Sequence, residues 1–349
     1  MKTGVLLINL GTPDAPRTPE VRRFLREFLS DPGVLGLSPI PRWLLVNLVI
    51  LPRRPKQSAE AYAAIWSDEG SPLMVHSRAL VEKVRPLLPD FTVALGMRYG
   101  TPSIADGFEE LKAAGCERVI VSPLFPQYSG ATFGSILERV EELSTTHWQP
   151  DEISIVPPFY DDPGFLDSFA ELGREALETR QPDHLLFSFH GLPESFVRDA
   201  DPSSSHCLSN PDCCAEITEV NRSCYRAHCM ATARGIAERL ALAPEEWSVC
   251  FQSRLGRTPW LGPYTDQVVV DMAKSGVRRL AVYCPSFVAD CLETLEEIGM
   301  RAGMEFQEAG GESLDLIPSL NSTDSWVHAV AKLVQKADAN WAPLETASA

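Results

Sequence analysis

Short apolar runs alternate along this chain with longer amphipathic stretches, and this alternation constrains the fold more than any other feature. The apolar runs, each of strand length, are residues 5–9, 92–97, 118–122, 153–156, 184–189, 248–252, 280–284 and 314–317. The stretches of helical periodicity are residues 18–29, 103–114, 133–143, 163–179, 224–240, 266–275, 291–303 and 324–337. Because apolar runs separated by helices form βαβ units, the sequence predicts an α/β fold with two doubly wound parallel sheets.

One local pattern occurs twice. Residues 115–123 and 276–285 both read as a helix end, a glycine, a basic residue, a strand and a proline. A chain of 349 residues is long enough for two cores, so we expect two similar Rossmann-like domains. The predicted boundaries are 1–158, with the last helix (324–337) packing back on this half, and 159–323, with an insertion at 203–230.

Composition limits the partners. The net charge is −16, which repels a phosphate backbone and argues against nucleic acid as a partner. No uninterrupted apolar run reaches the ~18 residues of a membrane span. Residues 35–51 come near it and are followed by clustered basic residues, so we expect residues 35–54 to form an exposed apolar lip on a membrane surface. The alternative is a buried core helix.

Eight of the nine cysteines fall into two groups. Cys116, Cys250 and Cys284 lie in apolar runs typical of core positions, whereas five others crowd into a polar stretch: Cys207, Cys213, Cys214, Cys224 and Cys229. The chain opens without a secretory signal pattern, so we expect a reducing cytoplasm and no disulfides. Thiolates bind zinc or an iron–sulfur cluster, and the absence of two Cys-x2-Cys pairs favours the cluster. One thiol is spare, and we place it in the vicinal pair 213–214, because adjacent side chains rarely point at one metal.

The ends of the predicted strands carry most of the chemistry, and ligands of parallel sheets bind there. The first strand lacks a G-x-G-x-x-G pattern, so a dinucleotide is not indicated. His190 ends a strand and is followed by glycine, which suits a general base, although a buried structural histidine is the alternative. Glu293 and Glu297 are spaced to share one helix face with Asp290 before them; an ordinary solvated helix also carries such runs.

Five motifs then identify a resemblance. They are GMRYGTPSI (96–104), PQYSGATFGS (126–135), FSFHGLPES (187–195), QSRLGRTPWLGPYTD (252–266) and CPSFVADCLETLEE (284–297). Together they resemble ferrochelatase, the enzyme that inserts Fe²⁺ into a porphyrin, over nearly the whole chain. The resemblance implies a chelatase-like fold of two similar domains, with the porphyrin in the cleft between them.

The resemblance also implies roles for individual residues. His190 matches the histidine expected to take pyrrole protons, and Glu293 matches the catalytic glutamate opposite it. Asp290 and Glu297 match an acidic path for protons or iron. The residues expected to hold the porphyrin are Leu10, Ser71, Arg98, Tyr99, Trp260 and Phe287.

Two departures from the family pattern matter. Cys291 stands where many ferrochelatases have a second histidine, so a metal-handing role there is in doubt. Animal ferrochelatases carry a [2Fe–2S] cluster bound by a C-terminal extension and one cysteine of the PQYS loop, where this chain has Gly130. A cluster in this chain is therefore expected to come from the 203–230 insertion alone.

The substrate follows from smaller features. Asp14 stands near where coproporphyrin-using relatives tend to have a tyrosine, and the apolar lip resembles that of membrane-associated enzymes. We therefore expect protoporphyrin IX as the substrate, a [2Fe–2S] cluster as the cofactor, and a cytoplasmic protein peripherally associated with the inner membrane. The alternatives are coproporphyrin III, a chelatase for cobalt or sirohydrochlorin-type substrates, and a non-catalytic haem or iron–sulfur carrier.

Overall fold

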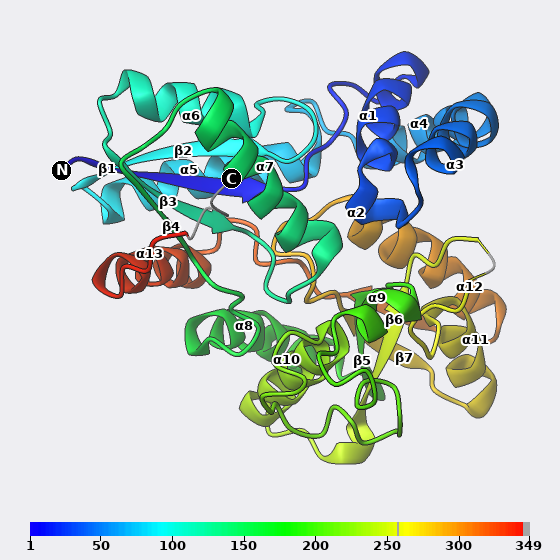
Figure 1. Ribbon diagram of the computed structural model, residues 1–349. Coiled ribbons are helices and arrows are strands. Elements are labelled where there is room, and N and C mark those ends of the chain that lie inside the picture. Colours follow the sequence, from blue (N-terminus) through cyan, green and yellow to red (C-terminus); the bar gives the residue numbers. More distant parts are fainter. Residues whose placement is uncertain (257, 345–349) are drawn as a thin grey trace. The chain divides into compact units, whose positions relative to one another are not determined.

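Two four-stranded parallel sheets organise the computed structural model, which describes residues 1–256 and 258–344 (Figure 1). The chain divides into two units. The first consists of residues 1–125, 130–157 and the chain from Ser322 onward, and the second of residues 126–129 and 158–321. The short segment 126–129 thus groups with the second unit although the chain on both sides of it belongs to the first.

The first sheet has the strand order β2-β1-β3-β4. Its strands are β1 (Thr3–Asn9), β2 (Phe91–Met97), β3 (Arg118–Pro123) and β4 (Glu152–Ile155). Val5 of the central strand lies opposite Val93 and Ile120 of its neighbours. All of β1 is buried, because helices cover both faces of the sheet.

Helices on each face complete the first core. Leu6 and Ile8 pack with α6 (Ile104–Ala113) and α7 (Ser135–Thr146), which follows a short π-helical turn, η3 (Gly130–Gly134). The remaining helices of the sheet are α5 (Pro72–Val84), continued by η2 (Arg85–Leu87), and α13 (Asp324–Ala339). Because α13 contacts α5, β3 and β4, the last helix lies against this sheet.

A separate helical layer holds the predicted lip. Its elements are α1 (Thr18–Ser30), α2 (Pro32–Leu35), α3 (Pro39–Leu44), the π-helix η1 (Leu45–Ile50) and α4 (Leu51–Ile65). Val46 and Leu51 are buried against Leu29 of α1. Ile40, Trp43 and Leu48, by contrast, are 74%, 58% and 60% exposed. The segment is therefore an exposed apolar surface anchored by a few buried side chains, rather than a core helix.

Within the chain as described, none of the helices combines the length and the apolar character that crossing a membrane requires.

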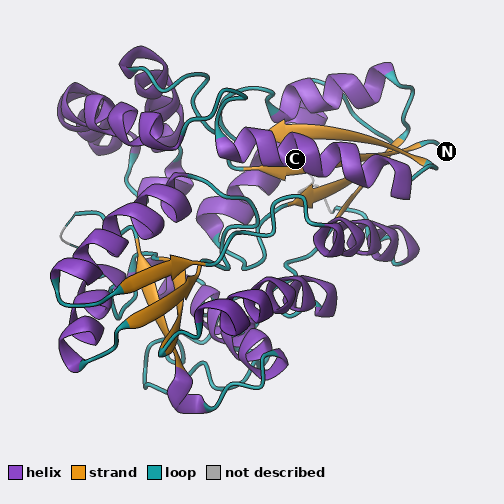
Figure 2. Ribbon diagram, turned by 180° about the vertical axis from the view of Figure 1, so that it is seen from behind, coloured by secondary structure: helices purple, strands orange, loops and turns teal. Residues whose placement is uncertain are grey.

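The second sheet repeats the topology of the first, with the order β6-β5-β7-β8 (Figure 2). Its strands are β5 (His184–His190), β6 (Trp247–Gln252), β7 (Arg279–Tyr283) and β8 (Ser313–Leu316). The flanking helical elements are α8 (Pro163–Arg180), α9 (Glu194–Asp199), α10 (Tyr225–Arg239), η4 (Pro244–Glu246), α11 (Thr265–Ser275), η5 (Glu293–Ala302) and α12 (Gly303–Glu308). Elements α11, η5 and α12 share one core with the sheet, in which Phe306 and Ile298 are buried.

The helix predicted over residues 291–303 differs in kind from the expectation. Residues Glu293–Ala302 form a π-helix, with hydrogen bonds from residue i to i+5, and Asp290 precedes it in an irregular segment. The predicted alignment of three carboxylates along one α-helical face is therefore wrong. Glu293 and Glu297 share the π-helix, whereas Asp290 lies outside it.

Candidate active site

His190 lies at the carboxyl end of β5 and is fixed by its own loop. Its ring nitrogen Nδ1 lies 2.6 Å from the carbonyl oxygen of Gly191, and the Gly191 N–H donates to the carbonyl of Gln252 over 2.8 Å. A Cβ at position 191 would lie 2.7 Å from that carbonyl oxygen, so the close approach requires glycine. Since a carbonyl can only accept, Nδ1 carries the proton and the Nε2 lone pair is left to accept another.

Two predicted aromatic residues surround this loop. The ring of Phe287 meets the His190 ring edge-on, with centroids 6.2 Å apart. Trp260 packs beside Gly191, and the next residue, Leu261, donates its N–H to the carbonyl of Leu192 over 2.9 Å. The indole nitrogen of Trp260 is buried and has no hydrogen-bond partner among the described residues. The structure thus brings Trp260 and Phe287 together around His190.

Among the three glutamates of η5, Glu297 is affected electrostatically by Glu293 and by a protonated His190. Ser253 donates to Glu297 from its backbone N–H (2.9 Å) and from its hydroxyl (2.6 Å). Burial raises the pKa of Glu297, the Ser253 hydrogen bond lowers it, the charge of Glu293 raises it, and the charge of His190 lowers it. Glu293 is itself tied through its backbone carbonyl, which accepts from the Gln252 amide over 2.8 Å.

Asp290 has a different environment. Its carboxylate is buried and accepts hydrogen bonds from the Thr294 hydroxyl (3.0 Å), the Ser319 N–H (3.2 Å) and the Asn321 amide (2.8 Å). These contacts join the start of the helix to the segment after β8. In this structure Asp290 therefore supports the loop that leads into Glu293.

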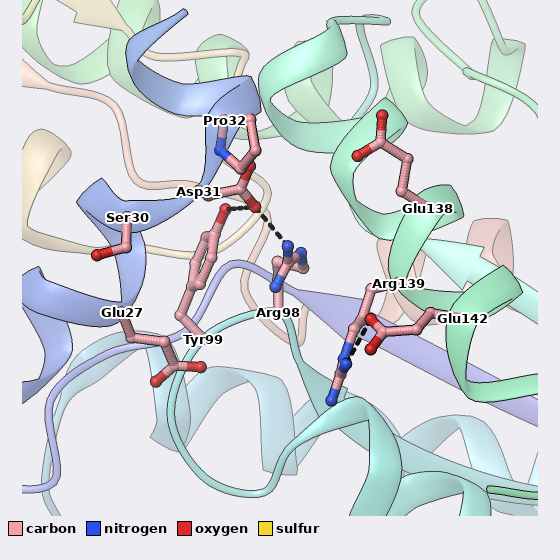
Figure 3. A pocket seen from close by; sticks show the side chains of 9 residues that line it. All are labelled: Glu27, Ser30, Asp31, Pro32, Arg98, Tyr99, Glu138, Arg139 and Glu142. Carbon is pink, nitrogen blue, oxygen red and sulfur yellow. Dashed lines mark hydrogen bonds and ion pairs between the residues drawn. The ribbon is translucent and has the colours of Figure 1, made fainter. Parts of the chain in front are cut away.

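Arg98 and Tyr99 follow β2 in the first unit, and both are held by a residue that sequence reasoning missed. Asp31 accepts from the Arg98 guanidinium and from the Tyr99 hydroxyl (2.8 Å) (Figure 3). It also accepts from the Ser135 hydroxyl (2.7 Å). Burial is the main cause that raises the pKa of Tyr99. Together with the side chains of α1 and α7, this network lines a cavity of about 360 Å³.

The other predicted residues of this unit lie at the end of β1. The Leu10 carbonyl accepts from the Tyr99 N–H over 2.9 Å, so the ends of β1 and β2 are adjacent. Gly11 has φ +113°, and a Cβ there would lie 1.8 Å from the Tyr99 carbonyl oxygen. Ser71, at the start of α5, accepts from the Thr12 hydroxyl over 2.8 Å. Leu10, Ser71 and Tyr99 therefore connect through one short segment.

The five cysteines of the insertion are all buried, with 0–5% of each residue exposed. The Sγ atoms of Cys213 and Cys214 are 3.7 Å apart, so the argument that adjacent thiols point apart is wrong for this pair. The Arg226 guanidinium lies 3.2 Å from the Cys214 sulfur and 3.7 Å from the Cys213 sulfur. Cys224 exchanges hydrogen bonds with Cys207 and with Cys214.

These thiols are free, and they suit soft metals by their chemistry. Burial raises the pKa of Cys207 and Cys229, and the hydrogen bond with Cys224 raises that of Cys214. Nowhere in residues 1–256 and 258–344 do three ligating side chains already surround a single metal position. The residues therefore match a cluster in the type of ligand they offer. The thiols of Cys207, Cys224, Cys214 and Cys213 are neighbours and lie beside Arg226, but the described residues do not form a complete coordination site.

The ferrochelatase family model matches residues 2–338, which establishes the family of this chain. The chain belongs to the ferrochelatase family. A ferrochelatase of Coxiella burnetii (strain Dugway 5J108-111) is 49% identical over 336 residues, covering 96% of this chain and 94% of the relative. One of Bdellovibrio bacteriovorus is 44% identical over 335 residues, covering 96% and 99%.

Solved structures agree in fold. The sirohydrochlorin chelatase SirB of Bacillus subtilis subspecies spizizenii, in complex with cobalt, is similar with a TM-score of 0.55 at 12% identity, covering 98% of this chain and 97% of that one. SirB from Bacillus subtilis with Fe³⁺ is similar with a TM-score of 0.53 at 15% identity, covering 97% of each. The two-sheet α/β fold is thus that of the chelatases. By its family, the chain is a porphyrin metal chelatase of haem biosynthesis, with a porphyrin and ferrous iron as substrates.

Proposed function

We propose that this ferrochelatase inserts Fe²⁺ into protoporphyrin IX, with His190 as the base that takes the pyrrole protons. The observation that carries the proposal is the hydrogen bond of His190 Nδ1 to the Gly191 carbonyl, which leaves Nε2 as a proton acceptor. A porphyrin must lose two N–H protons as the metal enters, so a fixed neutral imidazole supplies what the reaction needs.

We assign Glu293 and Glu297 to the transfer of charge away from this base. A protonated His190 is stabilised by nearby carboxylates, and a positive charge on His190 lowers the pKa of Glu297. Asp290 belongs to the same proposal as the buried support of the Glu293 loop. Leu10, Ser71, Arg98, Tyr99, Trp260 and Phe287 are proposed to hold the macrocycle.

Replacement of the base tests the first assignment. We expect His190→Ala to keep the fold and to lower kcat for Fe²⁺ insertion by about 10²- to 10⁴-fold, the usual contribution of a general base. His184→Ala, at the opposite end of β5, is the matched control and should retain near-normal turnover. Wild-type turnover in His190→Ala would refute the assignment. Parallel assays with protoporphyrin IX and coproporphyrin III identify the substrate.

The apolar surface on α3 and η1 supports protoporphyrin. Protoporphyrin carries two vinyl groups where coproporphyrin carries charged propionates, and it partitions into lipid. Ile40, Trp43 and Leu48 are exposed on this surface, and the exposed Arg53, Arg54 and Lys56 follow it. We propose that residues 35–54 contact an anionic membrane surface from the cytoplasmic side.

We also propose that four of the five cysteines of the insertion hold a [2Fe–2S] cluster, which would add a redox-active, negatively charged group to the segment. Cys207, Cys214 and Cys224 exchange hydrogen bonds, and Cys213 lies beside Cys214. Arg226 would offset the charge of the bound thiolates. Because the sulfurs of Cys213 and Cys214 lie close together, both can bind the same cluster. The thiol that does not bind can therefore be that of Cys229, Cys213 or Cys214.

Spectroscopy of the purified protein tests the cluster without reference to activity. We expect visible absorption bands, a paramagnetic signal after reduction and about two irons per chain. Cys224→Ser should abolish all three, whereas Cys116→Ser, which removes a buried thiol of the other unit, should leave them unchanged. A colourless protein that contains zinc would refute the cluster and leave the enzyme assignment intact.

A further inference from the structure

The first turn of α10 places a tyrosine hydroxyl against the His190 loop. Tyr225 is buried, and its hydroxyl donates to the backbone carbonyl of His190 over 2.8 Å. The same oxygen lies 2.9 Å from the hydroxyl of Ser286. Since the single phenolic hydrogen goes to the carbonyl, Ser286 is the donor in the second bond.

Both contacts bear on the imidazole. The His190 carbonyl belongs to the peptide unit that joins His190 to Gly191, and the Gly191 carbonyl is the acceptor for Nδ1. Rotation of that peptide would displace the acceptor. Ser286 adjoins Phe287, whose ring meets the His190 ring. One hydroxyl therefore joins the two loops that set the position of this side chain.

Tyr225 also belongs to the cysteine segment. It directly follows Cys224, the residue before the first turn of α10, and its hydroxyl exchanges a hydrogen bond with the Cys229 thiol one turn later. The hydroxyl thus links the His190 loop to a helix that carries Cys229 and is directly preceded by Cys224.

We propose that Tyr225 is a positioning residue for His190: its hydroxyl fixes the 190–191 peptide and thereby the hydrogen bond that orients the imidazole. This inference rests on the proposed role of His190 as the base. It extends that role to a residue that hydrogen-bonds to the His190 backbone, and it assigns a catalytic consequence to the start of α10.

The test compares two tyrosines that lose equivalent bonds. Tyr225→Phe removes the bond to His190, and Tyr283→Phe removes a buried bond, 3.0 Å long, to the Phe169 carbonyl elsewhere in the same unit. We expect Tyr225→Phe to lower kcat by about 10- to 100-fold, the effect of a misplaced catalytic group, with KM for the porphyrin changed less than about two-fold. Tyr283→Phe should retain the wild-type kcat.

Nuclear magnetic resonance of ¹⁵N-histidine-labelled protein supplies a readout independent of turnover. We expect Tyr225→Phe to shift the His190 ring resonances, assigned by their loss in His190→Ala, and Tyr283→Phe to leave them in place. Unchanged His190 resonances in Tyr225→Phe would overturn the positioning role whatever the activity. Normal turnover in His190→Ala would instead overturn the proposed base, while shifted resonances would still support the structural link.

Discussion

Ser253 contacts both carboxylate oxygens of Glu297, so this carboxylate cannot turn about its terminal bond without losing a hydrogen bond. One of the two donors is a backbone N–H just beyond β6, and the other is the hydroxyl of the same residue. The orientation of the Glu297 carboxylate is therefore set by Ser253, directly after β6, rather than by η5. This explains how a carboxylate on a π-helix holds one orientation.

Removal of the Ser253 hydroxyl tests this orientation. We expect Ser253→Ala to lower kcat by about ten-fold, because a hydrogen bond to a charged group contributes about 1.5–3 kcal/mol. The backbone donor remains, so the fold should persist. Ser275→Ala removes an exposed hydroxyl at the end of α11 and serves as the control in steady-state assays. Equal kinetics for both variants would contradict the role of Ser253.

Replacement of Asp31 should strongly lower the stability of the first unit. We expect Asp31→Asn to lower the free energy of unfolding by about 3–5 kcal/mol, because it removes the buried counter-charge of the partly buried Arg98 guanidinium. Asp14→Asn breaks a solvent-exposed pair with Arg23 and should change stability by less than about 1 kcal/mol. Chemical denaturation of the two variants measures the difference, and similar midpoints would refute the importance of the network.

The exposed apolar surface should govern vesicle binding. We expect Leu44→Asp combined with Leu48→Asp to lower the affinity for anionic vesicles by about 100-fold, because two apolar side chains that would move from water into the lipid are replaced by charged ones. Ile217→Asp combined with Met304→Asp changes two exposed apolar residues elsewhere and should leave binding unchanged. Co-sedimentation checks both. Identical binding of all variants would mean that residues 35–54 do not contact the membrane.

His184, at the start of β5, should make the folding stability of the protein depend on pH. Burial lowers the pKa of His184 in the folded protein, while a hydrogen bond to the Glu245 backbone opposes this. The unfolded chain then takes up a proton more readily than the folded one, so stability is complete above the ordinary histidine pKa of about 6.5 and falls as the pH drops below it. His184→Gln should flatten this decline in melting curves between pH 7 and 5. An unchanged slope would contradict the assignment.

The strands were the part of the fold that sequence could predict. All eight predicted runs are strands in the structure; β1, for instance, begins at Thr3 rather than at Val5. Strands buried on both faces read as continuous apolar runs, so their signal survives without any tertiary information. The helix α5 was not predicted, and neither was the helix that the structure shows at Leu51–Ile65, which contains Pro52 and Pro55.

The site was predictable to the extent that it follows strand ends. His190, Arg98 and Tyr99 each end or follow a strand, and the family motifs contain them. Asp31 was not predictable, because its partners Arg98 and Ser135 lie 67 and 104 residues away and an Asp-Pro-Gly triplet reads as a simple turn. A π-helix differs from an α-helix in which carbonyl each N–H bonds to, so it has no distinctive sequence pattern.

The return of the C-terminal helix to the first unit has a consequence for synthesis. On the ribosome the chain emerges from its N-terminus, so α13, which is bound by Lys83 of α5 and Arg118 of β3, emerges after the other helices and strands of the first unit. Residues 158–321 of the second unit are by then complete. The unit that begins first therefore waits for the second, and part of its sheet stays uncovered until α13 has been synthesised.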